Sequence, residues 1–281
     1  MNQFVIVRRI LLGCVLCLFA APTVWGVRQT GLTLSTPEQF KDEFQTVPCK
    51  DKDRQDAVKA LYEKMGAAPS NIAVEKKGGV ENVVIRKPGT ADGIIVIGAH
   101  YDKVTEGCGA LDNWSGTVAV AHLYRTLKNV SLKKTILFVA FGKEERGLIG
   151  SRAMVDAIKK DELAQYCAMV NLDTFGLAAP QVMDNTSSEK LEAVTEEIAK
   201  EMKMPFSHAR IDGGDADSSS FLAKKIPAIT LHGMTNAWPK ILHSNNDQAA
   251  KVNPESVYLG YRLALALVIR LDAAACDAYR R

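Results

Sequence analysis

Three residues that could bind a metal ion or transfer a proton lie close together after an apolar run of the sequence. The stretch GAHYDKVTEGCGALDNWSG, residues 98–116, directly follows the run IIVI (94–97) and contains His100, Asp102 and Asp112. Imidazole nitrogens and carboxylate oxygens are ligands that zinc takes in catalytic sites. The glycines of this stretch give the chain the freedom to fold back on itself. The stretch therefore indicates a polar site at the end of a buried strand.

Side chains of the same kind follow three later parts of the chain. The apolar runs KTILFVAFG and AMVNL lead into Glu144-Glu145 and Asp173, and the loop after AITLHG carries His243. In open α/β sheets, functional groups gather beyond the carboxyl ends of the strands, so we expect these groups to converge with those of residues 98–116. Four crowded carboxylates would repel one another strongly unless cations offset their charge. Nitrogen and oxygen donors without a thiolate suit a pair of zinc ions.

The elements that must position these residues alternate along the chain. Apolar runs predict strands, and helical periodicity of apolar residues predicts helices. The expected strands lie at 93–99, 135–141, 168–172 and 228–232, and the expected helices at 116–128, 148–159, 188–202 and 254–273. Ahead of them we expect helices at 37–46 and 51–65 and a hairpin formed by 72–74 and 80–85. This alternation predicts an α/β fold with a mainly parallel, twisted sheet sandwiched by helices.

The first residues read as a secretory signal. Arg8 and Arg9 precede an uncharged apolar run, residues 10–25, and cleavage after Gly26 fits the pattern of small residues. We therefore expect an exported protein, periplasmic or extracellular, with a signal peptide at 1–26 and one domain at 27–281. An uncleaved N-terminal anchor is the alternative, although the run is short for a membrane span.

Charge and cysteine content limit the partners and the compartment. Without the signal, 33 basic residues face 32 acidic ones in no obvious block, which gives no support for nucleic acid or an anionic membrane as partner. Cys49, Cys108, Cys167 and Cys276 remain, an even number in a chain bound for an oxidising compartment. They allow three disulfide pairings, and the sequence does not choose among them.

The motifs GAHYD, LDNWSG, FGKEERGLIGSR, NLDTFG, DSSSF with IPAI, and LHSNND resemble, in order and approximate spacing, the M28 family of dizinc aminopeptidases. The resemblance extends from about residue 93 to the C-terminus. It implies the phosphorylase/hydrolase-like fold of zinc exopeptidases. Only about 70 residues separate Asp173 from His243, which leaves no room for a lid or dimerisation insertion. The resemblance therefore implies a single domain with an open site, and it favours a monomer.

The same resemblance implies a role for each residue of the candidate site. Asp112 would bridge two zinc ions, of which one is completed by Glu145 and His243 and the other by His100 and Asp173. Glu144 would be the general base. The carboxylate of Asp102 would accept the other ring N–H of His100 and hold the imidazole in place. The peptide bond Asp112–Asn113 would be cis, and the substrates would be peptides with a free N-terminus.

Three alternatives remain open. A glutaminyl cyclase uses the same scaffold with one working zinc, but such proteins tend to place an aromatic residue where this chain has Leu242. A carboxypeptidase or dipeptidase would need a basic clamp, for which Lys103, Arg146 and Lys240 are candidates. A binding domain without catalysis would be expected to lack ligands, whereas all are present here. His122 and His208 are read as core or surface residues, and Asp217-Ser218-Ser219 departs from the Asp-His-Ser that is frequent in the family.

Overall fold

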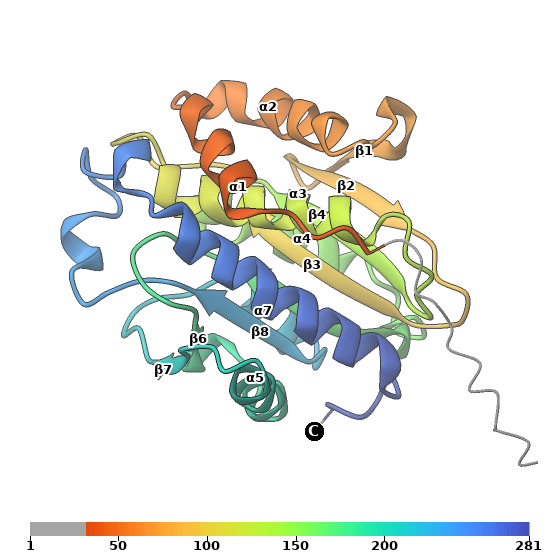
Figure 1. The fold of residues 1–281 in the computed structure, drawn as a ribbon. Coiled ribbons are helices and arrows are strands. Elements are labelled where there is room, and N and C mark those ends of the chain that lie inside the picture. The colour runs from red at the N-terminus through yellow and green to blue at the C-terminus, as the bar shows by residue number, and fades with distance from the viewer. Residues whose placement is uncertain (1–31, 281) are drawn as a thin grey trace, which may run out of the picture. The chain divides into compact units, whose positions relative to one another are not determined.

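A single mixed β-sheet organises the part of the chain that the computed structural model describes, residues 32–280 (Figure 1). The expected signal peptide lies outside these residues. Over the described range the sheet has eight strands in the order β1-β2-β4-β3-β5-β8-β6-β7. The strands are β1 Ile72–Lys77, β2 Val80–Lys87, β3 Ile94–His100, β4 Thr135–Phe141, β5 Tyr166–Leu172, β6 Gln181–Met183, β7 Ser207–Ala209 and β8 Ala228–His232.

The centre of the sheet is parallel and its margins are not. Strands β4, β3, β5 and β8 run parallel, whereas β1 and β2 pair antiparallel with their neighbours, and β6 pairs antiparallel with β8 but parallel with β7. The prediction of a mainly parallel sheet is therefore right for the four strands that carry the candidate site and incomplete at the edges. The hairpin β1–β2 turns at Gly78 and Gly79, both with positive φ, as expected. The short edge strands β6 and β7 were not predicted, because three residues are too few to show a period.

Helices cover both faces of this sheet. They are α1 Pro37–Glu43, α2 Asp51–Lys64, α3 Ser115–Leu127, α4 Ile149–Asp156, α5 Glu189–Glu201, α6 Asp217–Ala223 and α7 Pro254–Ala273. All except α6 agree with an expected helix to within a few residues. The helix α1 begins as the sequence indicates, with Pro37 in its first turn and a capping box between Thr36 and Gln39.

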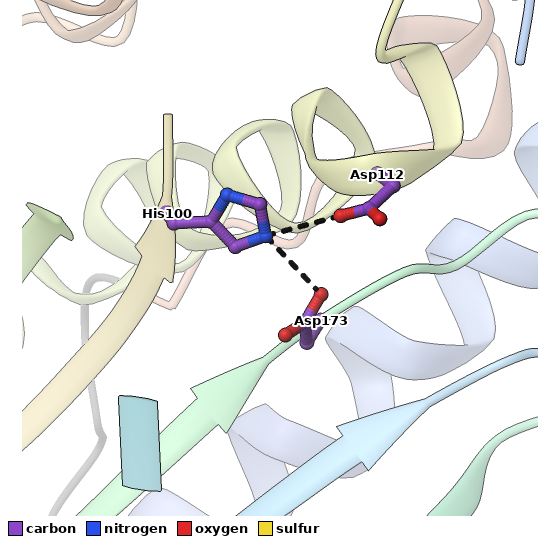
Figure 2. Close-up of side chains that lie close together, drawn as sticks. All are labelled: His100, Asp112 and Asp173. Atoms are coloured by element: carbon purple, nitrogen blue, oxygen red, sulfur yellow. Dashed lines mark ion pairs between the residues drawn. The ribbon is translucent and has the colours of Figure 1, made fainter. Parts of the chain in front are cut away.

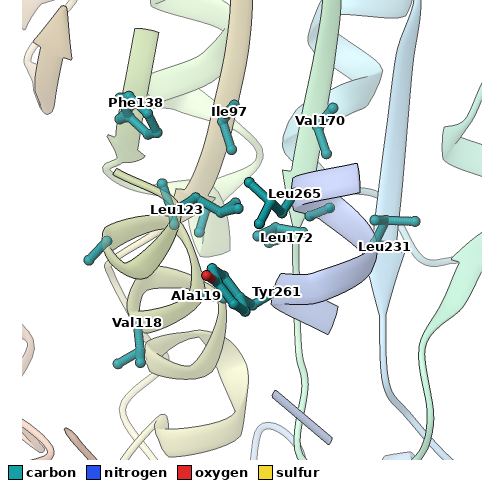
Figure 3. Close-up of a cluster of buried hydrophobic side chains, with 14 of the residues drawn as sticks. Ile97, Val118, Ala119, Leu123, Phe138, Val170, Leu172, Leu231, Tyr261 and Leu265 are labelled. Carbon is teal, nitrogen blue, oxygen red and sulfur yellow. The ribbon is translucent and has the colours of Figure 1, made fainter. Parts of the chain in front are cut away.

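Alternate residues of the central strands pack into two separate cores. Ile95 and Ile97 of β3 face a large core that also holds α3 and α7, whereas Val96 faces a smaller one under α4 and α6. Figure 3 shows the large core, where Leu265 of α7 and Leu123 of α3 meet the strands. The central strands are thus buried on both faces, which fixes their register and hence the position of their carboxyl ends.

The four cysteines form the disulfides Cys49–Cys108 and Cys167–Cys276. The first ties the chain ahead of α2 to the glycine-rich loop after β3, and the second ties β5 to the C-terminal segment. The paired residues are 59 and 109 positions apart. Loops of that size are expected to stabilise the fold by about 4 to 5 kcal/mol each through the entropy of the unfolded chain. Within residues 32–280, no helix has both the length and the apolar character to cross a membrane.

Candidate metal centre

The strand ends bring the candidate residues together in two groups. His100 is the last residue of β3 and Asp173 directly follows β5, and both lie beside Asp112 (Figure 2). His100 Nε2 is 3.1 Å from Asp112 Oδ1 and 3.6 Å from Asp173 Oδ1. On the other side, His243 Nε2 is 3.1 Å from both Asp112 Oδ2 and Glu145 Oε2. The convergence expected from the sequence is confirmed for all five residues.

Asp112 belongs to both groups and offers a different oxygen to each. In the group His100, Asp112 and Asp173, and in the group Asp112, Glu145 and His243, the donor atoms lie within 4.8 Å of one another. The donors are imidazole nitrogens and carboxylate oxygens, which suit zinc. Glu145 Oε1 is buried without a hydrogen-bond partner. Each group therefore has the donor types and spacing that one metal ion requires, and the residues fit a pair of ions that share Asp112.

The backbone around Asp112 is held by groups from distant parts of the chain. The N–H groups of Leu111 and Asp112 donate to the carboxylate of Asp247, at 2.7 and 3.1 Å. The Asp112–Asn113 peptide bond is cis, as the resemblance implies. The Asn113 side chain donates to the Leu172 carbonyl and accepts from the N–H of Thr174. Asn113 therefore links the position of Asp112 to the loop that carries Asp173.

Asp102 acts through different atoms from those expected. Its main-chain carbonyl lies 3.2 Å from His100 Nδ1, whereas its carboxylate is 3.7 Å away, too far for a hydrogen bond. The carboxylate instead accepts the backbone N–H groups of Glu144 and Glu145, at 2.9 and 3.3 Å. The expectation that the carboxylate holds the ring is thus corrected. The carbonyl holds His100, and the carboxylate fixes the turn that presents the two glutamates.

Without bound cations, the electrostatics of the site favour retained protons. Burial raises the pKa of Glu144 to about 10, and the charges of Asp217 and Asp173 add to this effect. Burial by itself would lower the pKa of His100, but Glu144 and Asp173 outweigh it and raise that pKa well above 6.5. Hydrogen bonds to Asp112 and Glu145 raise the pKa of His243 to about 10. The metal-free site therefore partly neutralises its crowded acids with protons.

Two acidic residues near the centre had received no role from the sequence. Asp247 lies in the motif LHSNND, and its buried carboxylate fixes the Asp112 loop. Asp217, the first residue of α6, is fully buried, and neither of its oxygens has a hydrogen-bond partner in the described part of the chain. Burial raises its pKa to about 7. The neighbouring Ser218, where the family often has histidine, donates to the Thr186 carbonyl, and its Oγ lies 2.6 Å from Thr230 Oγ1.

The structure places the other two candidate histidines outside the centre. His122 is buried in α3, with Nδ1 2.7 Å from Ser35 Oγ. His208 lies on the edge strand β7, half exposed, with Nδ1 2.8 Å from the carboxylate of Asp184. His122 is thus a core residue, whereas His208 lies at the surface in a third group of possible metal donors, with Asp184 and Glu192.

Histidines and carboxylates lie together at the carboxyl ends of the parallel strands. These features place the chain in the class of α/β proteins that can bind metal at one edge of the sheet. Within that class, this chain belongs to peptidase family M28, because the model of that family matches residues 82–268. The match includes every residue of the two donor groups.

Individual proteins are also similar to this chain in sequence or in structure. Leucine aminopeptidase 2 of Trichophyton equinum is 26% identical over 221 residues, which cover 68% of this chain and 42% of that protein. A zinc aminopeptidase of Bacillus subtilis has a similar structure, with a TM-score of 0.62 and 25% identity over 72% of this chain and 53% of that one. A glutaminyl cyclase of an Acidobacteriales bacterium shares the fold, with a TM-score of 0.74 and 17% identity over 87% of this chain and 97% of that one. The chain spans less than half the length of the curated relatives that it matches.

The electrostatics of the centre predict two classes of histidine in the metal-free protein. His243 should hold its second proton at pH 8, because its pKa is raised to about 10, and His100 should titrate well above pH 6.5. His122 and His232 should stay neutral down to about pH 5, since burial lowers their pKa values to about 3 and about 4. Ring chemical shifts measured by NMR across a pH titration would separate the two classes.

The variant Asp112→Asn provides the control. It removes a charged acceptor from both rings, so the pKa values of His100 and His243 should fall while that of His122 stays unchanged. Titration of both site histidines near pH 6.5 in the unmodified protein would contradict this description of the site.

Proposed function

We propose that the protein is a zinc-dependent aminopeptidase with two metal ions. The observation that carries this proposal is the pair of three-residue donor groups that share Asp112. The names of two relatives in the family, a leucine aminopeptidase and a zinc aminopeptidase, support the activity and the metal. Donors limited to nitrogen and oxygen, with three protein groups for each ion, suit zinc in a catalytic site that keeps a position open for water.

In this proposal each residue has one task. His100 and Asp173 would hold one ion, Glu145 and His243 would hold the other, and Asp112 would serve both. Bound zinc supplies a water of lowered pKa and polarises the scissile carbonyl. The residues of the chain position the ions, and Glu144 carries the proton.

Glu144 is the proposed general base. It belongs to neither donor group, but its backbone is fixed next to that of Glu145 by the carboxylate of Asp102. Burial raises its pKa in the metal-free protein, and cations nearby would bring it back toward neutral pH, where a base works best. The Glu144 carboxylate then accepts a proton from the attacking water and delivers it to the leaving amine.

The surroundings favour an amino rather than a carboxyl terminus of the substrate. Bound zinc would neutralise the ligand carboxylates, but Glu144 belongs to neither donor group, and its carboxylate would attract an α-ammonium group and repel an α-carboxylate. Lys103, a candidate clamp for a substrate carboxylate, is buried, and its Nζ donates to the carbonyls of Val104 and Thr105. These contacts argue against Lys103 as the clamp that a carboxypeptidase would need. Two complete donor groups argue against a cyclase that works with one zinc.

Export remains part of the proposal. Two disulfides join four cysteines, and such bonds persist in oxidising compartments such as the periplasm and the extracellular space. They support the secretory signal expected at residues 1–26.

The activity predicts a simple pattern of substrates. Aminoacyl-p-nitroanilides should be hydrolysed, N-acetylated versions should not, and full zinc chelation should abolish turnover reversibly. A peptide with N-terminal glutamine should release free glutamine, as followed by mass spectrometry. Formation of a pyroglutamyl peptide would point to a cyclase instead, and turnover that survives complete chelation would contradict the metal mechanism.

The two adjacent glutamates provide a matched pair of variants. Glu144→Gln should lower kcat by about 10²- to 10⁴-fold, because a general base is lost, while zinc binding stays intact. Glu145→Gln should weaken zinc binding, because it removes a carboxylate oxygen 3.1 Å from His243 Nε2. Kinetics and metal analysis of both variants make the comparison. The reverse result, with metal lost in Glu144→Gln and kept in Glu145→Gln, would show that the two roles are exchanged.

A further inference from the structure

A fully buried arginine lies beneath the loop that carries Asp112. Arg54 of α2 is 0% exposed and heads the largest fully buried side chains of the described residues. Its Nη2 donates to the Gly109 carbonyl at 2.7 Å, and its guanidinium carbon lies 5.5 Å from the centre of the Trp114 ring. The helix α2 lies outside the span matched by the family model, residues 82–268.

This guanidinium has few direct partners. Its Nε and Nη1 have no hydrogen-bond partner, and within residues 32–280 it forms no ion pair with a carboxylate inside 4.0 Å. A buried charge of this kind is strongly destabilising unless other charges offset it. The carboxylates that attract it are those of Asp112, Asp247, Asp102 and Asp51. The cation therefore depends on the acids of the centre and of its supporting loops.

The acids of the centre also depend on Arg54. In the proposed enzyme two divalent cations would neutralise these acids. In the metal-free protein the charge of those cations is missing, and Arg54 supplies part of the positive charge that the acids need. Burial lowers the pKa of Arg54 to about 10, which still leaves the side chain charged at neutral pH. It is a permanent positive charge beside Asp112.

Arg54 also packs directly against the backbone of the loop that carries Asp112. A Cβ at Gly109 would lie 2.3 Å from Arg54 Nη1 and 2.9 Å from the carbonyl oxygen of Asp112, so the guanidinium lies directly against the Asp112 loop. The first residue of α2 and the segment just ahead of it also contact the chain between β3 and Asp112. Asp51 accepts the backbone N–H of Lys103, and the disulfide Cys49–Cys108 lies just ahead of the helix.

We propose that Arg54 is a positioning residue, an internal cation that keeps the metal centre assembled while no metal is bound. The proposal rests on the proposed function only in requiring that the centre binds divalent cations. The charge of Arg54 has an effect on metal binding that a neutral packing residue would not have. A positive charge that stabilises the empty acidic site also opposes the entry of cations. Arg54 must therefore stabilise the metal-free form more than the metal-bound form, and by linkage it weakens metal binding.

The variants Arg54→Met and Arg54→Lys test this consequence through melting temperatures of the full chain, zinc-free and with saturating zinc. Arg54→Met fills most of the space without charge. It should lower the melting temperature by about 10 °C in the zinc-free form, and by less than half of that in the zinc-loaded form. Arg54→Lys keeps the charge and should recover more than half of the zinc-free loss. Competition with a chromophoric chelator should show zinc binding about tenfold tighter in Arg54→Met.

Lys134→Met is the matched control. Lys134 is also a buried base, but it precedes β4 at the opposite end of the sheet and donates to the carbonyls of Asp272 and Ala274. Its replacement should lower the melting temperature equally with and without zinc.

Three results would overturn the proposal. One is an equal loss of melting temperature with and without zinc in Arg54→Met, since that is the behaviour of a packing residue. Another is an Arg54→Met protein that stays unfolded at saturating zinc. The third is zinc binding that is unchanged or weaker in this variant. A wild-type protein whose melting temperature zinc does not raise would overturn the metal centre itself, and that outcome is distinct from the other three because it appears before any substitution is made.

Discussion

The carboxylate of Asp112 lies between two histidines, and much of the fold serves to keep it there. One of its oxygens is 3.1 Å from His100 and the other is 3.1 Å from His243, in a place where Glu145, Asp173 and further acids are also buried. Such a cluster is unfavourable in the absence of positive charge, because buried carboxylates lose their hydration and repel one another. Cations, protons and a buried arginine are three ways to satisfy the same electrostatic requirement.

The architecture holds these acids and histidines in fixed positions relative to one another. Four parallel strands end at one edge of the sheet, and burial on both faces fixes how far each strand extends. The loops beyond those ends are linked to one another, since Asn113 reaches from the Asp112 loop to the Asp173 loop and Asp102 reaches to the glutamate turn. Asp247 and the disulfide at Cys108 connect the same loop to the last motif and to the chain ahead of α2. The donors are thus preorganised by backbone contacts rather than by the metal alone.

The sequence predicts the centre of this molecule better than its margins. Long apolar runs locate β3, β4, β5 and β8, and polar residues directly after them identify the candidate site. The three-residue strands β6 and β7 and the helix α6 carry too little periodicity to be recognised. The disulfide pairing depends on which loops meet in space, which composition does not encode. Asp102 was assigned correctly as a neighbour of His100, but residue type alone does not tell whether the carbonyl or the carboxylate makes the contact. Arg54 did leave a signal, since it occupies the same helical face as Val58, Leu61 and Tyr62, where a charge is out of place.

The number of metal ions that the purified protein holds is the most direct measure of whether two sites share Asp112. After loading with excess zinc and dialysis against zinc-free buffer, mass-spectrometric metal analysis should find two zinc ions per chain in the wild type. Removal of the shared ligand in Asp112→Ala should release both ions, whereas His243→Ala should release mainly the one held with Glu145. A wild-type protein that binds a single ion, or an Asp112→Ala variant that retains two, would contradict a dinuclear centre built on Asp112.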